Sequence, residues 1–396
     1  MKFKKIDLYI LNILGVIRFS CFVLMAVTFQ KDILKKKEIH VSKVNPIILQ
    51  NPVKITTTEK KVIPKLNKIV VKILYPAKKC EKLSTIRSQL LTRMNIKLLP
   101  KIKIKKQIRV AVIDTGLNIN VSAFHHRLYL PKDLVLDPSG FGIDYSTEKV
   151  SYKPIDTNGH GSNVSGILIS LFPQAKILPI KYYNPKKSGN ENLDALNKSL
   201  RAAIDANVDI INISGGGPQP SREEFELLSE AKDKGIIVVL AAGNERSNVN
   251  EKEETYKLFD YIPKHGKNSY YPASYNLDNM ISVMNIRDDL SKDPSSNYGK
   301  NSVHLAALGN SIYSYGSVTD NNCAIKMTGT SQSTPIVTAT VAMIKAEFPH
   351  LSYQEIKAKV LESTKKYDLL ENLNATNGII DIERSLANVK KENQVK

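Results

Sequence analysis

Tryptophan is absent from this 396-residue chain, and only three cysteines are present. Three cysteines cannot hold a chain of this length together, which excludes a disulfide scaffold. The sequence also lacks a repeat of fixed period, which excludes collagen-like and coiled-coil arrays. Apolar residues make up 42% of the chain, enough for a substantial core, so wholesale disorder is excluded as well. The length allows two or three domains, or one large α/β domain with extensions.

Acidic residues are scarce only in the first quarter of the chain. Residues 1–106 hold 25 Lys and Arg against 5 Asp and Glu, whereas residues 107–396 hold 32 against 33. The formal charge of +19 therefore belongs to an N-terminal extension and not to the body. Because a nucleic-acid binder should carry its basic residues on a folded face, we expect no nucleic-acid partner. Attraction of the extension to anionic lipid explains the charge better.

The chain begins with lysines followed by an apolar run. Residues 8–29 are long enough to span a bilayer, although Arg18 near the middle would cost about 2.5–3.5 kcal/mol there. Alternatively, residues 1–18 form the basic part and residues 19–29 the apolar part of a signal peptide. We therefore expect residues 1–30 to be a signal peptide or membrane anchor. Either reading implies export, as a secreted or membrane-anchored protein, with possible membrane association through residues 1–37.

Residues 31–106 form a basic extension rich in Lys, Ile and Pro. They contain a strand-like run at 68–74 and one helical pattern at 82–93. The segment is interpreted either as a solvated linker or as a pro-segment that assists or blocks the domain after it. A disulfide between Cys80 and Cys323 is compatible with an exported protein, but the sequence leaves the pairing open.

From residue 107 the chain alternates between two kinds of pattern. Apolar, β-branched runs are typical of parallel strands covered on both faces, and they occur at 109–113, 176–181, 208–213, 236–241, 280–284 and 303–307. Helical patterns occur at 160–171, 193–204, 223–234, 336–348 and 353–363. This alternation predicts an α/β domain over 107–390, with a mainly parallel sheet between helices and a short tail at 391–396. The functional site should then lie at the carboxyl ends of the strands.

Two candidate residues lie directly after such patterns in the first half of the domain. Asp114 follows the run at 109–113, where an Asp is ordinarily a turn former or helix cap. His160 lies within residues 158–166, which read Asn-Gly-His-Gly-Ser-Asn-Val-Ser-Gly. A histidine at the start of a helix can also have a purely structural role. The flanking glycines favour a functional one, because they allow other backbone and a substrate to approach the ring closely.

Two further candidates lie in the second half of the domain. Asn244 follows the strand at 236–241 in a polar loop, where asparagine is common for turn formation alone. Ser331 lies within residues 328–335, which read Thr-Gly-Thr-Ser-Gln-Ser-Thr-Pro and precede the helix at 336–348. Thr330 and Ser331 are good helix N-caps, and Pro335 suits a first turn. Capping explains a Ser or Thr here, but not the whole block.

Together these four residues supply what hydrolysis of an amide needs. A serine hydroxyl such as that of Ser331 is a poor nucleophile until a base removes its proton, and His160 has the pKa range for that base. Asp114 would orient the imidazole and stabilise its cation. Asn244 would donate to the oxyanion, beside the backbone N–H of Ser331.

These motifs and their order resemble the subtilisin-like serine proteases, the subtilases, over about residues 107–390. The resemblance implies a three-layer αβα fold, a triad of Asp114, His160 and Ser331, and an oxyanion hole containing Asn244. It also implies protein or peptide substrates. The segments at 271–273, 303–309 and 378–381 are similar to family segments as well. The candidate substrate-binding residues are Ser214, Gly215, Gly216, Gly217, Gly243 and Glu245.

The sequence departs from the family pattern near two of the triad residues. Ser162, Asn163 and Ser165 replace the usual Thr, His and Ala after the base, and Gln332-Ser333 replaces Met-Ala after the nucleophile. These positions carry no catalytic proton, so we expect effects on local packing more than on activity.

The resemblance also suggests a cleavage preference. Residues 215–217 have no side chains to block a pocket, so a large residue could enter it. Glu245, by resemblance, lies near the pocket rim. We therefore expect a preference for large apolar residues, with Lys or Arg tolerated. The alternative for Glu245 is a solvated loop charge.

No cofactor and no metal ligand are assigned from the sequence. Structural calcium is common among subtilases, but no Asp-rich loop of fixed spacing identifies a site. The alternative function is a non-catalytic peptide-binding subtilase relative. Such a protein should show a damaged triad, and the sequence shows none.

Overall fold

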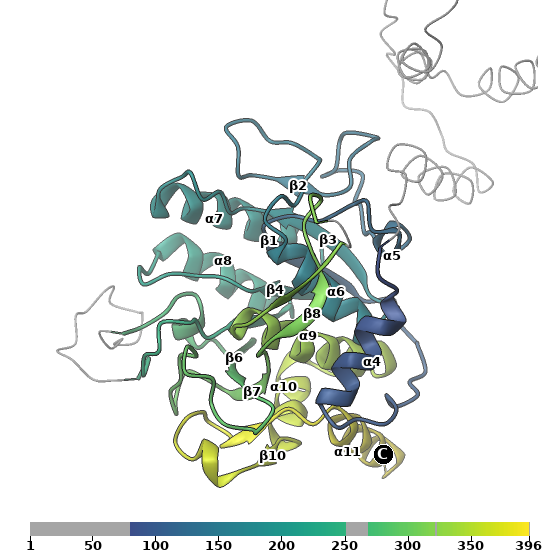
Figure 1. Ribbon diagram of the computed structural model, residues 1–396, viewed down its shortest axis with the longest axis vertical. Coiled ribbons are helices and arrows are strands. Elements are labelled where there is room, and N and C mark those ends of the chain that lie inside the picture. Colours follow the sequence, from purple (N-terminus) through teal and green to yellow (C-terminus); the bar gives the residue numbers. More distant parts are fainter. Residues whose placement is uncertain (1–79, 251–267, 321–322, 396) are drawn as a thin grey trace, which may run out of the picture. The chain divides into compact units, whose positions relative to one another are not determined.

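The computed structural model describes residues 80–250, 268–320 and 323–395, drawn as the coloured ribbon in Figure 1. The expected signal peptide or anchor, the strand-like run at 68–74 and most of the basic extension lie outside the described residues. Within the described part, no helix combines the length and the apolar character needed to cross a membrane. Membrane association through residues 1–37 therefore stays a prediction.

The described residues form one large sheet and one small one. The large sheet has nine strands in the order β10-β11-β7-β6-β5-β4-β1-β3-β2, and all its pairings are parallel except β10–β11. β8 and β9 form a separate antiparallel pair. The strands of the large sheet are β1 Arg109–Asp114, β2 Ile143–Asp144, β3 Lys176–Lys181, β4 Ile210–Ile213, β5 Ile237–Ala241, β6 Met280–Ile286, β7 Leu305–Leu308, β10 Lys365–Lys366 and β11 Gly378–Ile379; the pair is β8 Ile312–Tyr315 and β9 Ala324–Met327.

All six predicted strands are present, each within two residues of its predicted ends. Side chains along β1 show why these runs are continuously apolar. Val110 and Val112 belong to the core on one side of the sheet, and Ala111 and Ile113 belong to the core on the other. A strand buried on both faces has no polar alternation, as the sequence pattern indicated.

Helices cover both faces of the large sheet (Figure 1). One face is covered by α7 and α8, and the other by α6, α9, α10, α11 and α4. The helices are α4 Leu83–Arg93, α5 Ser122–His125, α6 His160–Leu171, α7 Gly189–Asp205, α8 Arg222–Asp233, α9 Thr330–Glu347, α10 Tyr353–Glu362 and α11 Ile382–Val395, with short 3-10 turns at Ala273–Tyr275 and Asp368–Leu370. α11 thus continues through the segment expected to be a C-terminal tail.

Helix α9 begins six residues earlier than its apolar pattern predicts. Its N-cap is Gly329, so the expectation that Thr330 or Ser331 caps the helix is wrong. The first turns are polar yet buried, because their side chains bond to nearby backbone. Thr334 Oγ1 donates to Thr330 O (2.8 Å), and Ser333 Oγ donates to Ala307 O (2.9 Å). These bonds satisfy polar groups that hydrophobic periodicity cannot detect.

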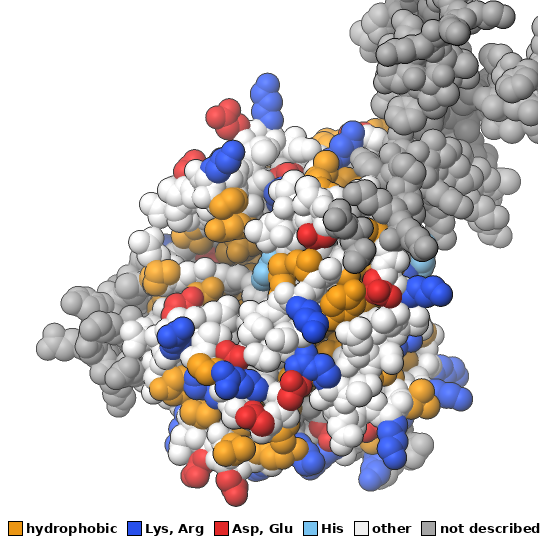
Figure 2. Space-filling view, viewed as in Figure 1, with side chains coloured by type: hydrophobic (Ala, Val, Ile, Leu, Met, Phe, Trp, Pro, Cys, Tyr) orange, Lys and Arg blue, Asp and Glu red, His pale blue; other side chains and the backbone are white. Residues whose placement is uncertain are grey.

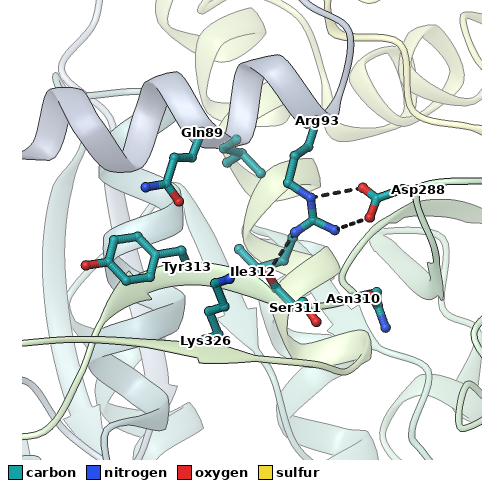
Figure 3. Close-up of a pocket in the computed structure, with 9 residues that line it drawn as sticks. Gln89, Arg93, Asp288, Asn310, Ser311, Ile312, Tyr313 and Lys326 are labelled. Atoms are coloured by element: carbon teal, nitrogen blue, oxygen red, sulfur yellow. Dashed lines mark hydrogen bonds and ion pairs between the residues drawn. The ribbon is translucent and has the colours of Figure 1, made fainter.

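Helix α4, at the end of the basic extension, packs on the domain. Ile86 and Leu90 are buried in the core shared with α6. Arg93 forms a bidentate ion pair with Asp288 (2.7 and 2.9 Å) and donates to the carbonyl oxygen of Ser311, as Figure 3 shows. A disulfide joins Cys80 to Cys323, the pairing that the sequence left open.

Candidate active site

The predicted site residues gather where the strand order of the large sheet reverses. β1 and β4 are neighbours; β3 and β2 continue the sheet on one side, and β5, β6 and β7 on the other. Asp114 ends β1, Ser214 directly follows β4, and Asn244 is the third residue after β5. In open parallel sheets this reversal point leaves a crevice at the carboxyl ends of the strands, and ligands bind there.

Asp114 and His160 form a hydrogen-bonded pair. The Nδ1 atom of His160, the first residue of α6, lies 2.7 Å from Asp114 Oδ1. The Asp114 side chain is 3% exposed and the His160 side chain 26% exposed. A carboxylate can only accept, so Nδ1 carries the proton and Nε2 is left as the basic nitrogen. The pair therefore has the tautomer that a general base requires.

The electrostatics of the pair favour the protonated ring. Burial opposes a charge on His160, but the charge of Asp114 and its hydrogen bond outweigh that effect, and the charge of Asp156 adds to them. Together they raise the pKa of His160 above its ordinary value. The ring is thus a stronger base than a free imidazole.

Asp156 is a residue of this site that sequence reasoning missed. It is fully buried, and its carboxylate accepts from Gly159 N (2.7 Å), Ser162 N (2.8 Å) and Ser162 Oγ (2.6 Å). It also accepts from Thr115 Oγ1 (3.0 Å), in the loop that follows β1. One carboxylate therefore fixes both the start of α6 and the turn after Asp114. Its position four residues before His160 was the available signal.

Gly161 allows α6 to begin directly against the end of β1. A Cβ at this position would lie against the backbone of Gly116 and 3.2 Å from Asp114 Cβ. The Gly161 N–H also donates to Thr115 Oγ1 (2.9 Å). The glycine after His160 thus admits the backbone of Gly116; the expected approach of a substrate to the ring stays a prediction.

Ser331 lies in the first turn of α9, and its side chain is buried. Its Oγ donates a hydrogen bond to the backbone carbonyl oxygen of Ser214 (2.8 Å). In the described part of the chain, the Ser331 hydroxyl therefore bonds to Ser214 and not to His160. The carbonyl of Ser331 accepts from Ser214 Oγ (3.1 Å). That carbonyl is left without its helical partner because Pro335, four residues on, has no N–H.

A buried chain of hydrogen bonds continues from Ser214 into the core. Asn212 Nδ2 donates to Ser214 Oγ (3.0 Å), and Thr338 Oγ1 donates to Asn212 Oδ1 (2.7 Å). The chain ties the end of β4 to the helix that carries Ser331. Sequence reasoning missed it, although a polar Asn212 within an otherwise apolar strand was a visible signal.

Asn244 is exposed and anchored by one end of its side chain. Its Oδ1 accepts from Thr330 N (3.0 Å) and from Thr330 Oγ1 (3.2 Å). The oxygen end is therefore occupied, and the amide NH₂ is the end left to donate. Gly243, before it, has a φ of +100°, a backbone conformation that favours glycine.

Two of the departures from the family pattern contact each other. Gln332 Nε2 lies 3.4 Å from Asn163 Oδ1, and Asn163 Nδ2 donates to Ile325 O (3.3 Å). The pair joins α6, which carries His160, to α9, which carries Ser331. A third departure, Ser162, bonds Asp156 as described above. The Gln332–Asn163 contact is thus a polar link between the two helices, and Ser162 is bonded separately to Asp156.

The predicted substrate-binding residues surround the same crevice. Gly217 exchanges two backbone hydrogen bonds with Tyr271 (2.9 and 2.7 Å), so its polar groups are used within the protein. Glu245 is exposed but not a freely solvated loop charge, because its Oε2 accepts from Asn297 Nδ2 (2.6 Å). Gly215 and Gly216 contact tyrosine side chains on the side where a Cβ would point.

The structure offers no cluster for a metal among the residues it describes. There, no group of three or more His, Cys, Asp or Glu side chains could hold an ion. Calcium also takes carbonyl ligands, so the calcium expectation stays untested. A pocket beneath α4, lined by Gln89, Arg93, Tyr313 and Lys326 among others, is separate from the predicted site (Figure 3).

Charged side chains of both signs are interspersed on the face drawn in Figure 2. This distribution agrees with the balanced charge of residues 107–396.

Comparison with known proteins identifies relatives of this chain. A family model described as the subtilase family matches residues 105–379. The major intracellular serine protease of Bacillus subtilis (strain 168) is 28% identical over 289 residues, covering 69% of this chain and 81% of that protein. The intracellular serine protease of Paenibacillus polymyxa is 31% identical over 271 residues, covering 65% of this chain and 74% of that protein.

A solved structure supports the same fold. The crystal structure of a cold adapted subtilisin-like serine proteinase matches with a TM-score of 0.53 and 20% identity, covering 70% of this chain and 89% of that one. The architecture is thus a subtilisin-like α/β fold with a mostly parallel sheet. With the family model matching more than two-thirds of its length, the chain belongs to the subtilase family of serine proteases.

Proposed function

We propose that this protein is a serine endopeptidase that hydrolyses peptide bonds through Asp114, His160 and Ser331. The observation that carries the proposal is the 2.7 Å hydrogen bond from His160 Nδ1 to Asp114. It leaves Nε2 as a base at the same edge of the sheet where Ser331 lies in the first turn of α9. Family membership supports the same chemistry.

The proposed reaction passes through an acyl-enzyme. His160 Nε2 takes the proton of Ser331 Oγ as that oxygen attacks the substrate carbonyl, and the resulting imidazolium is stabilised by Asp114. The imidazolium then gives its proton to the leaving amine as the peptide C–N bond breaks. A water molecule, deprotonated by the same ring, attacks the acyl carbon and releases Ser331.

The oxyanion formed in each step needs hydrogen-bond donors that are already in place. We assign this role to the Asn244 amide and the backbone N–H of Ser331. The support for Asn244 is that Thr330 occupies its oxygen end. The support for Ser331 is its place in the first turn of α9, where backbone N–H groups have no partner within the helix.

The bond from Ser331 Oγ to the Ser214 carbonyl must break before catalysis. An extended substrate pairing with residues 214–216 would bring its own N–H groups to this strand. A substrate N–H that donates to the Ser214 carbonyl displaces the Ser331 hydroxyl and frees it to turn toward His160. Catalytic hydrogen bonds often form only when substrate is bound.

Export is proposed for the whole chain. The Cys80–Cys323 disulfide supports it, because such bonds persist in oxidising compartments. Two of the relatives named above are called intracellular. Fractionation of the producing cells, combined with N-terminal sequencing of the recovered protein, tests export and identifies the processed N-terminus.

The proposed activity is tested by incubating wild type and Ser331→Ala with an unstructured protein such as casein. Wild type should release peptides, and the variant should release them at least about 10⁴-fold more slowly. A folded wild-type protein that binds peptides but does not cleave them would instead identify a non-catalytic peptide-binding subtilase relative.

A further inference from the structure

Three glycines around the crevice are packed against tyrosine side chains. A Cβ at Gly215 would collide with the hydroxyl of Tyr182. A Cβ at Gly216 would lie 2.8 Å from Tyr270 Cε1, and one at Gly243 would lie 2.8 Å from Tyr270 Cγ. Real Cβ atoms do not approach that closely. A Cβ at Gly216 would also collide with the backbone carbonyl oxygen of Tyr271, and one at Gly243 with the side chains of Asn297 and Glu245. These positions therefore need glycine because of atoms of the protein itself, the Tyr182 and Tyr270 side chains among them, before any substrate is considered.

The ring of Tyr270 touches both glycine segments. Gly216 belongs to the segment after β4, and Gly243 belongs to the segment after β5. Both segments hold candidate substrate-binding residues, and by resemblance to the subtilases they form the walls of the pocket for the substrate residue before the scissile bond. The Tyr270 ring therefore fills the space between the walls that the absence of glycine side chains would otherwise leave open.

The backbone that carries this ring is anchored by hydrogen bonds. Tyr270 N donates to Ser274 Oγ (2.9 Å), and Ser274 N donates to Tyr270 O (2.8 Å). The next residue, Tyr271, exchanges two backbone bonds with Gly217. Four hydrogen bonds thus fix the backbone of Tyr270 and Tyr271, and with it the point from which the Tyr270 ring extends.

The surroundings keep the Tyr270 side chain neutral. Burial, and to a smaller degree the charges of Glu245 and Glu224, raise the pKa of its hydroxyl well above the ordinary value. Glu245 is itself held by Asn297 near the same wall. The ring is thus uncharged at neutral pH, and an uncharged ring can occupy an apolar pocket.

We propose that Tyr270 determines specificity by filling the depth of the pocket for the residue before the scissile bond. The enzyme then cleaves after small residues such as alanine or serine, and not after the large apolar residues that the glycines alone suggested. The inference rests on the proposed function.

The test compares two tetrapeptide p-nitroanilides that differ only at the last residue, alanine or phenylalanine. Wild type should have a kcat/KM for alanine at least about tenfold above that for phenylalanine. Tyr270→Gly should shift this ratio toward phenylalanine by at least about tenfold, because it removes the ring. Tyr270→Leu removes less volume and should shift it less. Tyr270→Phe keeps the ring and should keep the wild-type ratio.

Each protein is first titrated with a fluorophosphonate, which separates failure of the inference from failure of the function. A wild type that is folded but neither labelled nor active overturns the proposed endopeptidase, and the inference with it. A labelled wild type that cleaves after phenylalanine as fast as after alanine overturns the inference alone. An unchanged ratio in a labelled Tyr270→Gly or Tyr270→Leu protein also overturns it.

Discussion

Two regions of the crevice differ in how far they are assembled without substrate. We call the end of β1 and the start of α6, with Asp114, Asp156 and His160, the base region. There the imidazole is hydrogen-bonded to Asp114, and Asp156 is hydrogen-bonded both to the turn after β1 and to the start of α6. In the nucleophile region, formed by Ser331 and the segment after β4, the hydroxyl bonds to the Ser214 carbonyl. In the proposed mechanism, the base is therefore in place without substrate, whereas the nucleophile must still turn toward it.

Glycines also serve the two regions differently. Gly161 of the base region makes room for the backbone of Gly116, whereas Gly216, in the segment after β4, makes room for the backbone of Tyr271 and also for the ring of Tyr270. A glycine in the sequence thus indicates a close approach but not what approaches. Changes in the base region should slow all substrates equally, whereas changes around Tyr270 should alter the ratio between substrates.

The largest effect in the base region is expected from Asp114→Asn. The amide can present an N–H to the ring, which favours the wrong tautomer of His160, so kcat should fall by about 10⁴-fold at neutral pH. Steady-state kinetics with the alanine and phenylalanine substrates measure it. A loss of kcat that differs between the two substrates by more than a few-fold would contradict the expectation that changes in the base region slow all substrates equally.

A smaller loss is expected from Asn244→Ala. Removing one oxyanion donor should lower kcat by about 10²–10³-fold with little change in KM; this magnitude is borrowed from subtilisin, a relative. Asn244→Asp retains the oxygen that accepts from Thr330 but removes the donor. It should therefore lose as much activity as Asn244→Ala; retention of activity in the aspartate variant would exclude the donor role.

Gly161→Ala should have an effect of up to about 10²-fold on kcat. The added methyl group pushes α6 away from Gly116 and displaces His160 from Asp114. Gly189→Ala, at the start of α7, is the matched control, because a Cβ there has nothing within 4 Å. If both Gly161→Ala and Gly189→Ala keep the wild-type kcat, the close approach of Gly161 to Gly116 is not needed to position His160.

The smallest effect concerns pH. His160 must be neutral to act as a base, and Asp114 raises its pKa, so kcat/KM should rise with pH through a midpoint above 6.5. In the residual activity of Asp114→Asn, the charge is gone and the midpoint should move to lower pH. Profiles of kcat/KM against pH for both proteins measure the shift. A midpoint that does not move would show that the Asp114 charge does not set the pKa of the group that titrates.

Much of the fold could be predicted from residue patterns, for identifiable physical reasons. β1 and β4 are buried on both faces, so their apolar runs are visible in the sequence. The start of α9 was predicted too late because its first turns are buried through side-chain hydrogen bonds and not through apolar side chains.

Site residues could be predicted from the sequence where their residue type suggests a chemical role. Residues that act by positioning or contacting another residue were harder to predict. His160 and Asp114 were found and lie together. Asp156 was missed, because an aspartate in a loop has many ordinary uses. Tyr270 was missed because its importance depends on which glycines lie beside it, and spatial neighbours are not visible in the sequence.

The central claim is that Ser331 is the nucleophile of this crevice. Mass-spectrometric mapping of the protein after fluorophosphonate treatment tests it most directly. The account predicts one adduct, on the peptide containing Ser331, which is lost in Ser331→Ala and strongly slowed in His160→Ala. An adduct on a different residue, or none on a folded wild-type protein, would contradict it.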